Sequence, residues 1–195
     1  MKCLILDSST KNLYVCLIVE NDIIYEKYLE GRNDHAKNIV FCIDEALKSA
    51  KIATEDLDKI VVGNGPGSYT GVRMAVSVAK MMAVFKGVEL NTISTLCLMS
   101  SGYKGIVKAS IDARRGNAFS SVINTNNNES ILEDGLYSYE DLEKYQCDFS
   151  VDDSSFKVDP FYCVNNSTKV ENPHLLVPNY LRDTEAERNL KWLES

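Results

Sequence analysis

The residues that first suggest chemistry lie in a glycine-rich stretch, IVVGNGPGSYTGVR, at positions 60–73. Glycines alternate at Gly63, Gly65 and Gly67, and Gly71 follows just before a long apolar run. Glycine allows positive φ and close approach to the backbone. Such a stretch is therefore either a phosphate-binding loop, and hence part of an enzyme, or a turn that joins a strand to a helix.

Both common nucleotide-binding motifs fail here. A Walker loop requires GxxxxGK[ST], and no lysine follows any of these glycines. The dinucleotide motif GxGxxG requires its third glycine one residue earlier than Gly71 when it starts at Gly65 and Gly67. An acidic ribose partner is expected about 20 residues later, and that region contains only Glu89.

The structural alternative is a turn that aims the following helix. Pro66 stiffens the turn, and Ser68 or Thr70 can cap the helix by accepting a hydrogen bond from a free N–H group. We favour this turn, while an anion at the helix N-terminus stays the alternative.

A second candidate is LDSST at positions 6–10, where Asp7 ends an apolar run and is followed by Ser8. Sugar kinases and actin-like ATPases use a similar Asp-x-Gly-Thr turn for phosphate and Mg²⁺, but Ser9 takes the glycine position here. We favour an ordinary strand-end aspartate. The run DARR that starts at Asp112 also combines an acid with two arginines, and a turn ion pair is favoured there over a phosphate contact.

Other catalytic constellations are weak. The two histidines, His35 and His174, have no His or Cys neighbours, the six cysteines form no CxxC pair, and GxSxG is absent. A nucleotide site between two lobes also needs a second glycine-rich loop, yet only Gly135 follows Gly116. These residues argue against an active ATPase and predict no metal in this chain.

Composition places these motifs in a globular protein. Apolar residues make up 45% and charged residues 25% of the 195 positions, which does not favour disorder. The net charge of −7 disfavours independent binding to nucleic acid. Asp7 interrupts the first apolar run, so no signal peptide is predicted, and the unpaired cysteines fit a reducing cytoplasm.

The elements that position the motifs follow from hydrophobic periodicity. The first half predicts the order βββαβαβα, with Asn33 or Asp34 capping the first helix. The predicted segments are strands 2–7, 13–21, 22–30, 58–64 and 88–94, and helices 35–51, 70–86 and 95–102.

The helix after the glycine loop is apolar around most of its circumference. Between residues 71 and 85 the polar residues are Arg73, Ser77 and Lys80, whose spacing puts them on one narrow stripe. The helix is too short for a membrane span and carries two cations. It is therefore either buried inside the domain or covered by a partner, and the small size of the domain favours the partner.

The second half of the chain repeats the start weakly. A shift of 105 residues places Asp7 on Asp112 and Asn12 on Asn117, with a third strand at 129–138 and a helix at 139–145. This pattern predicts a duplicated protein of two lobes, residues 1–103 and a smaller lobe 104–195 whose tail packs back on the first. The alternative is that any two amphipathic hairpins align this well.

Several motifs together resemble one family. LDSST, His35, GNGPGSYTGVRMAVSVAK (63–80), ISTL (93–96), IDARRGNAF (111–119) and PNYLR (178–182) are similar to the TsaB (YeaZ) family, over almost the whole chain and in order. The resemblance implies an α/β, actin-like or ribonuclease H-like (ASKHA) fold with two duplicated lobes and mixed sheets, the second lobe smaller and degenerate.

The resemblance also implies a pseudoenzyme. The catalytic paralogue TsaD carries a metal-binding His-x-x-x-His, whose place here falls at approximately Thr95 and Met99. Neither residue replaces imidazole as a ligand for a hard metal. The expected role is a non-catalytic scaffold that binds a TsaD-like protein and enables threonylcarbamoyl transfer to N6 of adenosine 37 in tRNA. A stand-alone ATPase or kinase and a metallopeptidase-like enzyme are the alternatives.

The family's partners follow from the same resemblance. A TsaD-like subunit, a TsaE-like ATPase and tRNA reached only through the complex are expected, with ATP and a metal ion held by the partners, no cofactor bound by this chain alone, and no membrane. A homodimer is possible when the chain is alone. The expected interface on helices 34–50 and 70–86 comprises His35, Ile39, Met74, Val78, Met81 and Met82. The vestigial phosphate-loop region comprises Asp7, Ser8, Ser9, Gly65, Gly67, Ser68 and Asp112.

Overall fold

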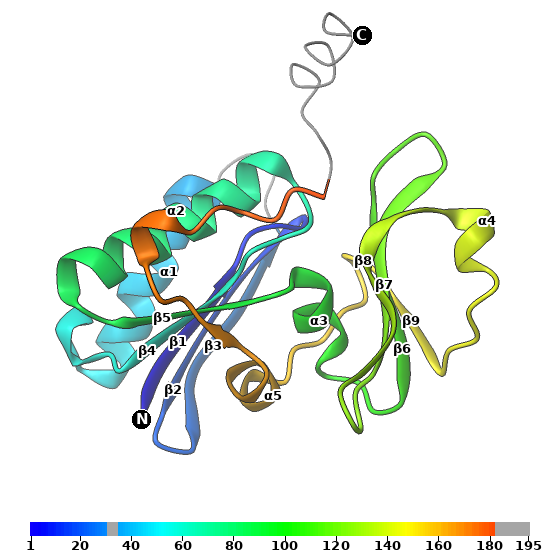
Figure 1. Cartoon of the computed structure of the whole chain (residues 1–195). Coiled ribbons are helices and arrows are strands. Elements are labelled where there is room, and N and C mark those ends of the chain that lie inside the picture. The colour runs from blue at the N-terminus through cyan, green and yellow to red at the C-terminus, as the bar shows by residue number, and fades with distance from the viewer. Residues whose placement is uncertain (31–34, 182–195) are drawn as a thin grey trace, which may run out of the picture.

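The computed structural model describes residues 1–30 and 35–181, and side chains in the first helix from residue 38 onward. Two β-sheets lie beside each other with a short helix between them (Figure 1). The mixed α/β arrangement of two sheets confirms the predicted fold class.

The first sheet has six strands in the order β10-β5-β4-β1-β2-β3. The strands β1, β2 and β3 are antiparallel, β4 and β5 run parallel to β1, and β10 is an antiparallel edge. Their bounds are β1 (Lys2–Asp7), β2 (Asn12–Val19), β3 (Asp22–Glu30), β4 (Lys59–Gly63), β5 (Glu89–Ile93) and β10 (Thr168–Lys169). The element order βββαβαβα predicted for the first half is confirmed.

Two long helices cover one face of this sheet. They are α1 (His35–Ala50) and α2 (Tyr69–Lys86), with the short 3-10 helix η1 (Thr54–Asp56) between α1 and β4. Alternate residues of β1 point to opposite faces, so Leu4 and Leu6 pack under α1 and α2 while Ile5 joins a different core. The predicted caps Asn33 and Asp34 lie outside the described residues.

The second sheet repeats the antiparallel start of the first. Its order is β8-β7-β6-β9, built from β6 (Ile106–Asp112), β7 (Asn117–Asn124), β8 (Glu129–Ser138) and β9 (Phe149–Val151). A single-turn helix, α4 (Tyr139–Leu142), follows β8. The predicted third strand and the helix after it are therefore confirmed, although the helix is shorter than expected.

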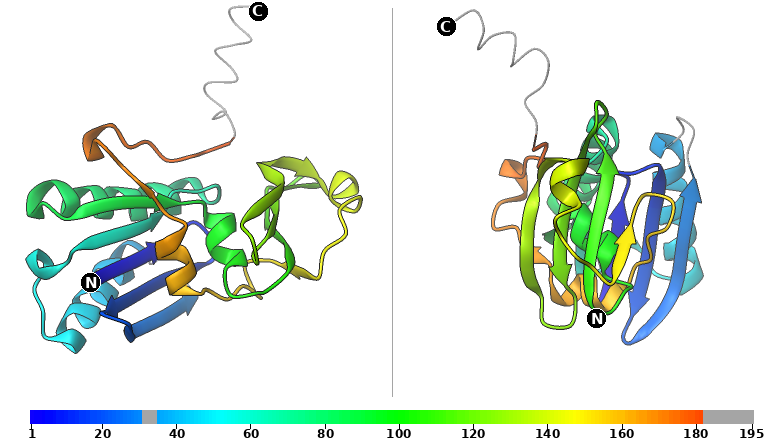
Figure 2. Two further views of the ribbon diagram at one scale, coloured as in Figure 1. Left: turned by 60° about the horizontal axis from the view of Figure 1, so that its bottom comes forward. Right: turned by 90° about the vertical axis from the view of Figure 1, so that its right-hand side faces the viewer.

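The core between the sheets is shared by both. Helix α3 (Thr95–Ser100) contacts β6 and β7, and α5 (Pro160–Asn165) contributes Cys163 to the same apolar cluster. Figure 2 shows α3 between the two sheets from a second direction. The sheets are thus joined by packed side chains as well as by the chain.

The last described segment returns to the first sheet. The strand β10 pairs with β5, and the 3-10 helix η2 (Pro173–Leu175) contacts α2. The Lys80 ammonium on α2 donates to the carbonyl oxygens of His174, at 3.1 Å, and Leu176, at 2.8 Å. We call residues 173–181 the strap. The predicted lobe boundary at 103 stays a prediction, and residues 182–195 of the predicted tail lie outside the described residues.

Candidate functional site

The glycine loop packs α2 against the end of β1. Ser68 is the N-cap of α2, and its hydroxyl oxygen accepts a hydrogen bond from the Gly71 N–H at 3.4 Å. A side chain at Gly71 would collide with the carbonyl oxygen of Ser8, and one at Gly63 would collide with the Asp7 carboxylate. These glycines are therefore needed for close packing inside the protein, in agreement with the predicted turn and with Ser68 as the cap.

Helix α2 is buried on only one side. The side chains that face the sheet are small or β-branched, and they are Val72, Ala75, Val76, Ala79 and Ala83. On the other side Met81 is 60% exposed and Phe85 is 78% exposed. Met74, Val78 and Met82 are half-buried at the edge of the core. The helix is not internal, and its apolar outer side needs another explanation.

Helix α1 adds apolar surface beside α2. Val40 is 60% exposed and Phe41 is 54% exposed. The structure corrects one predicted interface residue, because Ile39 is only 1% exposed and packs in the core, where no partner reaches it. His35 begins α1, and its side chain is not among those described. We call the exposed and half-buried apolar residues of the two helices the helical face: Val40, Phe41, Met74, Val78, Met81, Met82, Val84 and Phe85.

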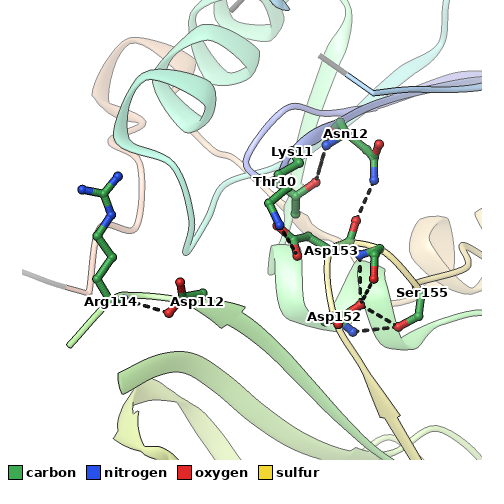
Figure 3. A network of polar contacts seen from close by, with 9 residues as sticks. Thr10, Lys11, Asn12, Asp112, Arg114, Asp152, Asp153 and Ser155 are labelled. Atoms are coloured by element: carbon green, nitrogen blue, oxygen red, sulfur yellow. Dashed lines mark hydrogen bonds and ion pairs between the residues drawn. The ribbon is translucent and has the colours of Figure 1, made fainter. Parts of the chain in front are cut away.

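A cleft of about 690 Å³ lies between the two halves of the molecule. Ion pairing and hydrogen bonding join its two walls, because the Lys11 ammonium lies 3.2 Å from the Asp153 carboxylate and the Asn12 amide donates to the Asp153 carbonyl oxygen at 2.7 Å (Figure 3). Its walls are formed by Ser9, Thr10, Lys11, Gly67, Ser68, Thr70, Gly71, Met74, Ile111, Asp112, Arg114, Phe119 and Asp153.

Some of the predicted phosphate-loop residues line this cleft, and others are buried and do not reach it. Ser9, Gly67, Ser68 and Asp112 line it. Asp7, Ser8 and Gly65 are buried and do not line it. The Asp112 carboxylate turns to its own loop, where it accepts a hydrogen bond from the Arg114 N–H at 2.9 Å (Figure 3).

The buried Asp7 carboxylate is bound by neighbouring groups of the protein. It accepts hydrogen bonds from the Thr95 hydroxyl at 2.7 Å, the Ser9 N–H at 2.7 Å and the Ser9 hydroxyl at 3.1 Å. Burial raises the pKa of Asp7 above its ordinary value, and the hydrogen bonds from Thr95 and Ser9 act in the opposite direction. Thr95 also accepts a hydrogen bond from the Gly65 N–H at 3.2 Å. This carboxylate therefore ties β1, α3 and the glycine loop to one another.

The place where the resemblance puts the paralogue's two histidines does not fit a hard metal ion. The Thr95 hydroxyl is already shared between Asp7 and Gly65. Met99 is fully buried in the core between the sheets, and its thioether is a soft ligand. Within residues 1–30 and 35–181 no cluster of three His, Cys, Asp or Glu side chains could hold a metal ion.

Two features were missed by sequence reasoning. Val40 and Phe41 were not assigned to the interface, although their positions fall off the buried stripe of Ile39 and Ile43. Their helical phase was the available signal. The bridges across the cleft, from Lys11 and Asn12, join residues more than 140 positions apart, and no local pattern announces them.

None of the helices in the described segments is long and apolar enough to span a membrane. This finding agrees with the charges on α2, which also argued against a span.

Comparison with known proteins gives a consistent picture. The family described as "TsaD: tRNA N6-adenosine threonylcarbamoyltransferase" matches residues 29–154, well over half of the chain. The chain is 27% identical to the tRNA threonylcarbamoyladenosine biosynthesis protein TsaB of Bacillus subtilis, and the match covers 100% of this chain and 99% of the relative.

Solved structures show the same fold. YeaZ from Pseudomonas aeruginosa superposes with a TM-score of 0.74 at 20% identity, covering 92% of this chain and 99% of that one. A second structure, described as an uncharacterized protein with similarity to peptidase YEAZ from Pseudomonas aeruginosa, gives a TM-score of 0.75 at 21% identity, covering 93% of this chain and 99% of that one. At these identities the likeness establishes the fold alone.

Proposed function

We propose that this chain, which belongs to the TsaD family, is a non-catalytic subunit of a tRNA-modifying complex. A relative that it matches over its full length is a TsaB protein. This chain binds a TsaD-like catalytic protein and enables transfer of a threonylcarbamoyl group to N6 of adenosine 37 in tRNA. The role of this chain in tRNA threonylcarbamoyladenosine biosynthesis is inferred from its similarity to B. subtilis TsaB, which extends over the whole chain.

The helical face is the observation that carries the binding role. Met81 and Phe85 on α2, and Val40 and Phe41 on α1, are each more than half exposed. Large exposed apolar side chains on adjacent helices mark surfaces that associate with another protein. Methionine and aromatic residues are enriched at such interfaces, because they bury much apolar area and adapt to a partner. The same face supports self-association when the partner is absent.

The non-catalytic role is supported by the interior of the first half. Asp7, the aspartate of the LDSST turn that resembles the phosphate turn of kinases, accepts three hydrogen bonds from within the protein. The metal and the ATP required by the reaction are therefore assigned to the partner subunits, a TsaD-like protein and a TsaE-like ATPase. We place this complex in the cytoplasm and expect tRNA to reach this chain only through it.

One observation favours a second candidate, a stand-alone ATPase or kinase. The cleft of about 690 Å³ is large enough for a small molecule, and hydroxyl groups from Ser9, Ser68 and Thr70 line it. Against this activity, Asp112 is engaged with its own turn and Asp7 does not line the cleft.

The proposal is tested by reconstituting tRNA modification from purified components. The cognate TsaD-like protein, the TsaE-like ATPase, a supply of threonylcarbamoyl-adenylate and unmodified tRNA are combined with and without this chain. We expect modification to collapse when the chain is left out, and the chain alone to modify nothing.

The second candidate, a stand-alone ATPase or kinase, is tested with the chain alone at millimolar nucleotide. ATP hydrolysis and binding of ATP-Mg²⁺ are measured. Modification that proceeds equally well without this chain would refute the scaffold role. Hydrolysis by the isolated chain would move the function to the cleft.

A further inference from the structure

One row of exposed side chains runs along α2 at a spacing of four residues. It consists of Tyr69, Arg73, Ser77, Met81 and Phe85, and every one of them is exposed. Residues four apart are neighbours on a helix, and each step of four turns about 40° around the axis, so these side chains form a row that winds across the outer side of α2. The row is apolar at the Met81 and Phe85 end and cationic at the Arg73 end.

Arg73 differs from the other two cations of α2. The Lys80 ammonium is used by the strap, and Lys86 forms an ion pair with Glu55. Arg73 instead donates to the Tyr69 hydroxyl at 2.9 Å and lies 5.2 Å from the centre of the Tyr69 ring. Among the described residues no carboxylate pairs with Arg73. A guanidinium has five N–H donors, so most remain available in a side chain already held in place.

The surface next to Arg73 is hollowed. A depression of about 340 Å³ lies between α2 and the strap, and Arg73 is part of its lining. Aromatic rings form one side, because Tyr69 and Tyr180 stack with their centres 4.9 Å apart. On the strap, Val177 is 68% exposed beside it. A side chain from another protein can therefore enter beside the guanidinium.

We propose that Arg73 binds a carboxylate of the protein partner that covers the helical face. This inference rests on the proposed function and adds the chemistry that orients the partner. A planar guanidinium pairs with a carboxylate through two parallel hydrogen bonds. Arg73 precedes Met81 by eight residues and Phe85 by twelve, which correspond to about 12 Å and about 18 Å along the helix axis. The partner therefore carries an acidic residue at these two separations, measured along the axis of α2, from the apolar residues that meet Met81 and Phe85.

The net charge of the chain does not prevent an acidic group from binding at Arg73. The chain carries a net charge of −7, so it repels an acidic partner at long range. At physiological ionic strength that repulsion is screened beyond about 8 Å, and the contact between the two groups decides the local energy. If the partner bound in the reverse direction, its apolar side chains would lie on Arg73 and its carboxylate would lie on Phe85. The pairing of Arg73 with that carboxylate therefore favours one orientation of the partner.

The test measures binding of the full-length chain to the cognate TsaD-like protein by calorimetry, at low and at high salt. Arg73→Gln removes the charge and keeps the size of the side chain. We expect about a tenfold loss of affinity and a weaker dependence on salt. Arg73→Lys keeps the charge but cannot form two parallel hydrogen bonds to a carboxylate, so an intermediate affinity is expected. Arg115→Gln changes another exposed arginine, on the turn after β6, and should bind as the wild type does.

The outcomes separate the inference from the function on which it rests. If the wild type binds and Arg73→Gln binds equally well, the carboxylate contact does not exist and the proposed function stands. If Arg73→Gln alters only self-association of the chain, the contact belongs to a second copy and the inference is overturned. If the wild type does not bind, the proposed function fails and the inference fails with it.

Discussion

The two halves of the molecule begin with the same three antiparallel strands but bury them differently. In β1 every residue from Cys3 to Asp7 is buried, because helices cover one face of the first sheet and the shared core covers the other. In β6 buried and half-buried residues alternate, because only the face toward the shared core is closely packed. The first sheet supports two long helices, whereas the second sheet is contacted by the short helices α3 and α4.

This difference separates the two halves by the surface that each exposes. The second half kept the strand scaffold and the turn at Asp112, and it contributes a wall of the cleft. The first half alone supports α1 and α2, whose outer sides form the helical face. The surface through which we propose that a partner binds therefore belongs to the first half.

The largest expected effect concerns the two aspartates that the repeat aligns. Asp7 is 2% exposed and accepts three hydrogen bonds, whereas Asp112 is exposed and accepts one from Arg114. Asp7→Ala leaves buried donors without an acceptor, and we expect it to lower the free energy of unfolding by about 3 kcal/mol. Asp112→Ala should cost less than about 1 kcal/mol. Chemical denaturation of both variants measures the difference.

Equal losses of stability in the two variants would show that Asp7 and Asp112 contribute alike to the fold. A more stable Asp7→Ala protein would mean that the buried carboxylate is a burden kept for another purpose, and Asp7 would return as a candidate functional residue.

The second prediction concerns exposed apolar side chains in each half. Met81, on α2, is 60% exposed, and Leu136, on β8, is 40% exposed. Met81→Arg should weaken binding to the TsaD-like partner about 30-fold, because a charge would be buried in the interface without a counterion. Leu136→Arg should leave the affinity unchanged. Calorimetric titration measures both, and each variant should keep its free energy of unfolding within about 0.5 kcal/mol.

A Met81→Arg variant that unfolds would place Met81 in the core and move the interface elsewhere. Loss of binding by Leu136→Arg would bring the second sheet into the interface and remove the division between the halves.

The smallest expected effect lies at the contact between the halves. The Ser94 hydroxyl, at the start of α3, donates to the Asp134 carboxylate of β8 at 2.5 Å. Burial raises the pKa of Asp134 above its ordinary value of 3.8, and hydrogen bonds from Ser94 and Ser121 oppose the shift. As the pH rises above 3.8, the unfolded chain releases this proton first, so the free energy of unfolding falls until the folded carboxyl has also ionised.

Asp134→Asn removes this titration. We expect its free energy of unfolding to fall less than that of the wild type as the pH rises from 3.8, with a difference below about 1 kcal/mol. Urea denaturation across the acidic range measures it. Identical pH profiles would show that Asp134 ionises in the folded protein as it does in the unfolded chain.

Much of the fold could be predicted because the signals were local. Alternating and continuous apolar runs fixed the strands and helices of the first half, and Gly71 with Ser68 indicated where α2 begins. The segment after residue 147 was harder. Helix α5 had a usable signal, since Asp159 caps it and Pro160 occupies its first turn. The two residues of β10 had none, because their strand exists only by pairing with β5.

Some features of the candidate site could also be predicted from the sequence, and others could not. The apolar circumference of α2 was readable from the sequence, and so was the shortage of glycine in the second half. The helical phase of Ile39 and Ile43 indicated the buried side of α1, but the sequence did not show that the side with Val40 and Phe41 stays exposed in the folded protein.

The elements of the first half and the family resemblance could be read from the sequence, and a duplication could be proposed from it, because each rests on residue type and spacing along the chain. Only the tertiary structure decided which side of α2 stays open, that Asp7 is committed to Thr95, and that Lys11 meets Asp153 across the cleft. The physical reason is that exposure and long-range pairing depend on what packs against a residue, and that neighbour comes from a distant part of the chain.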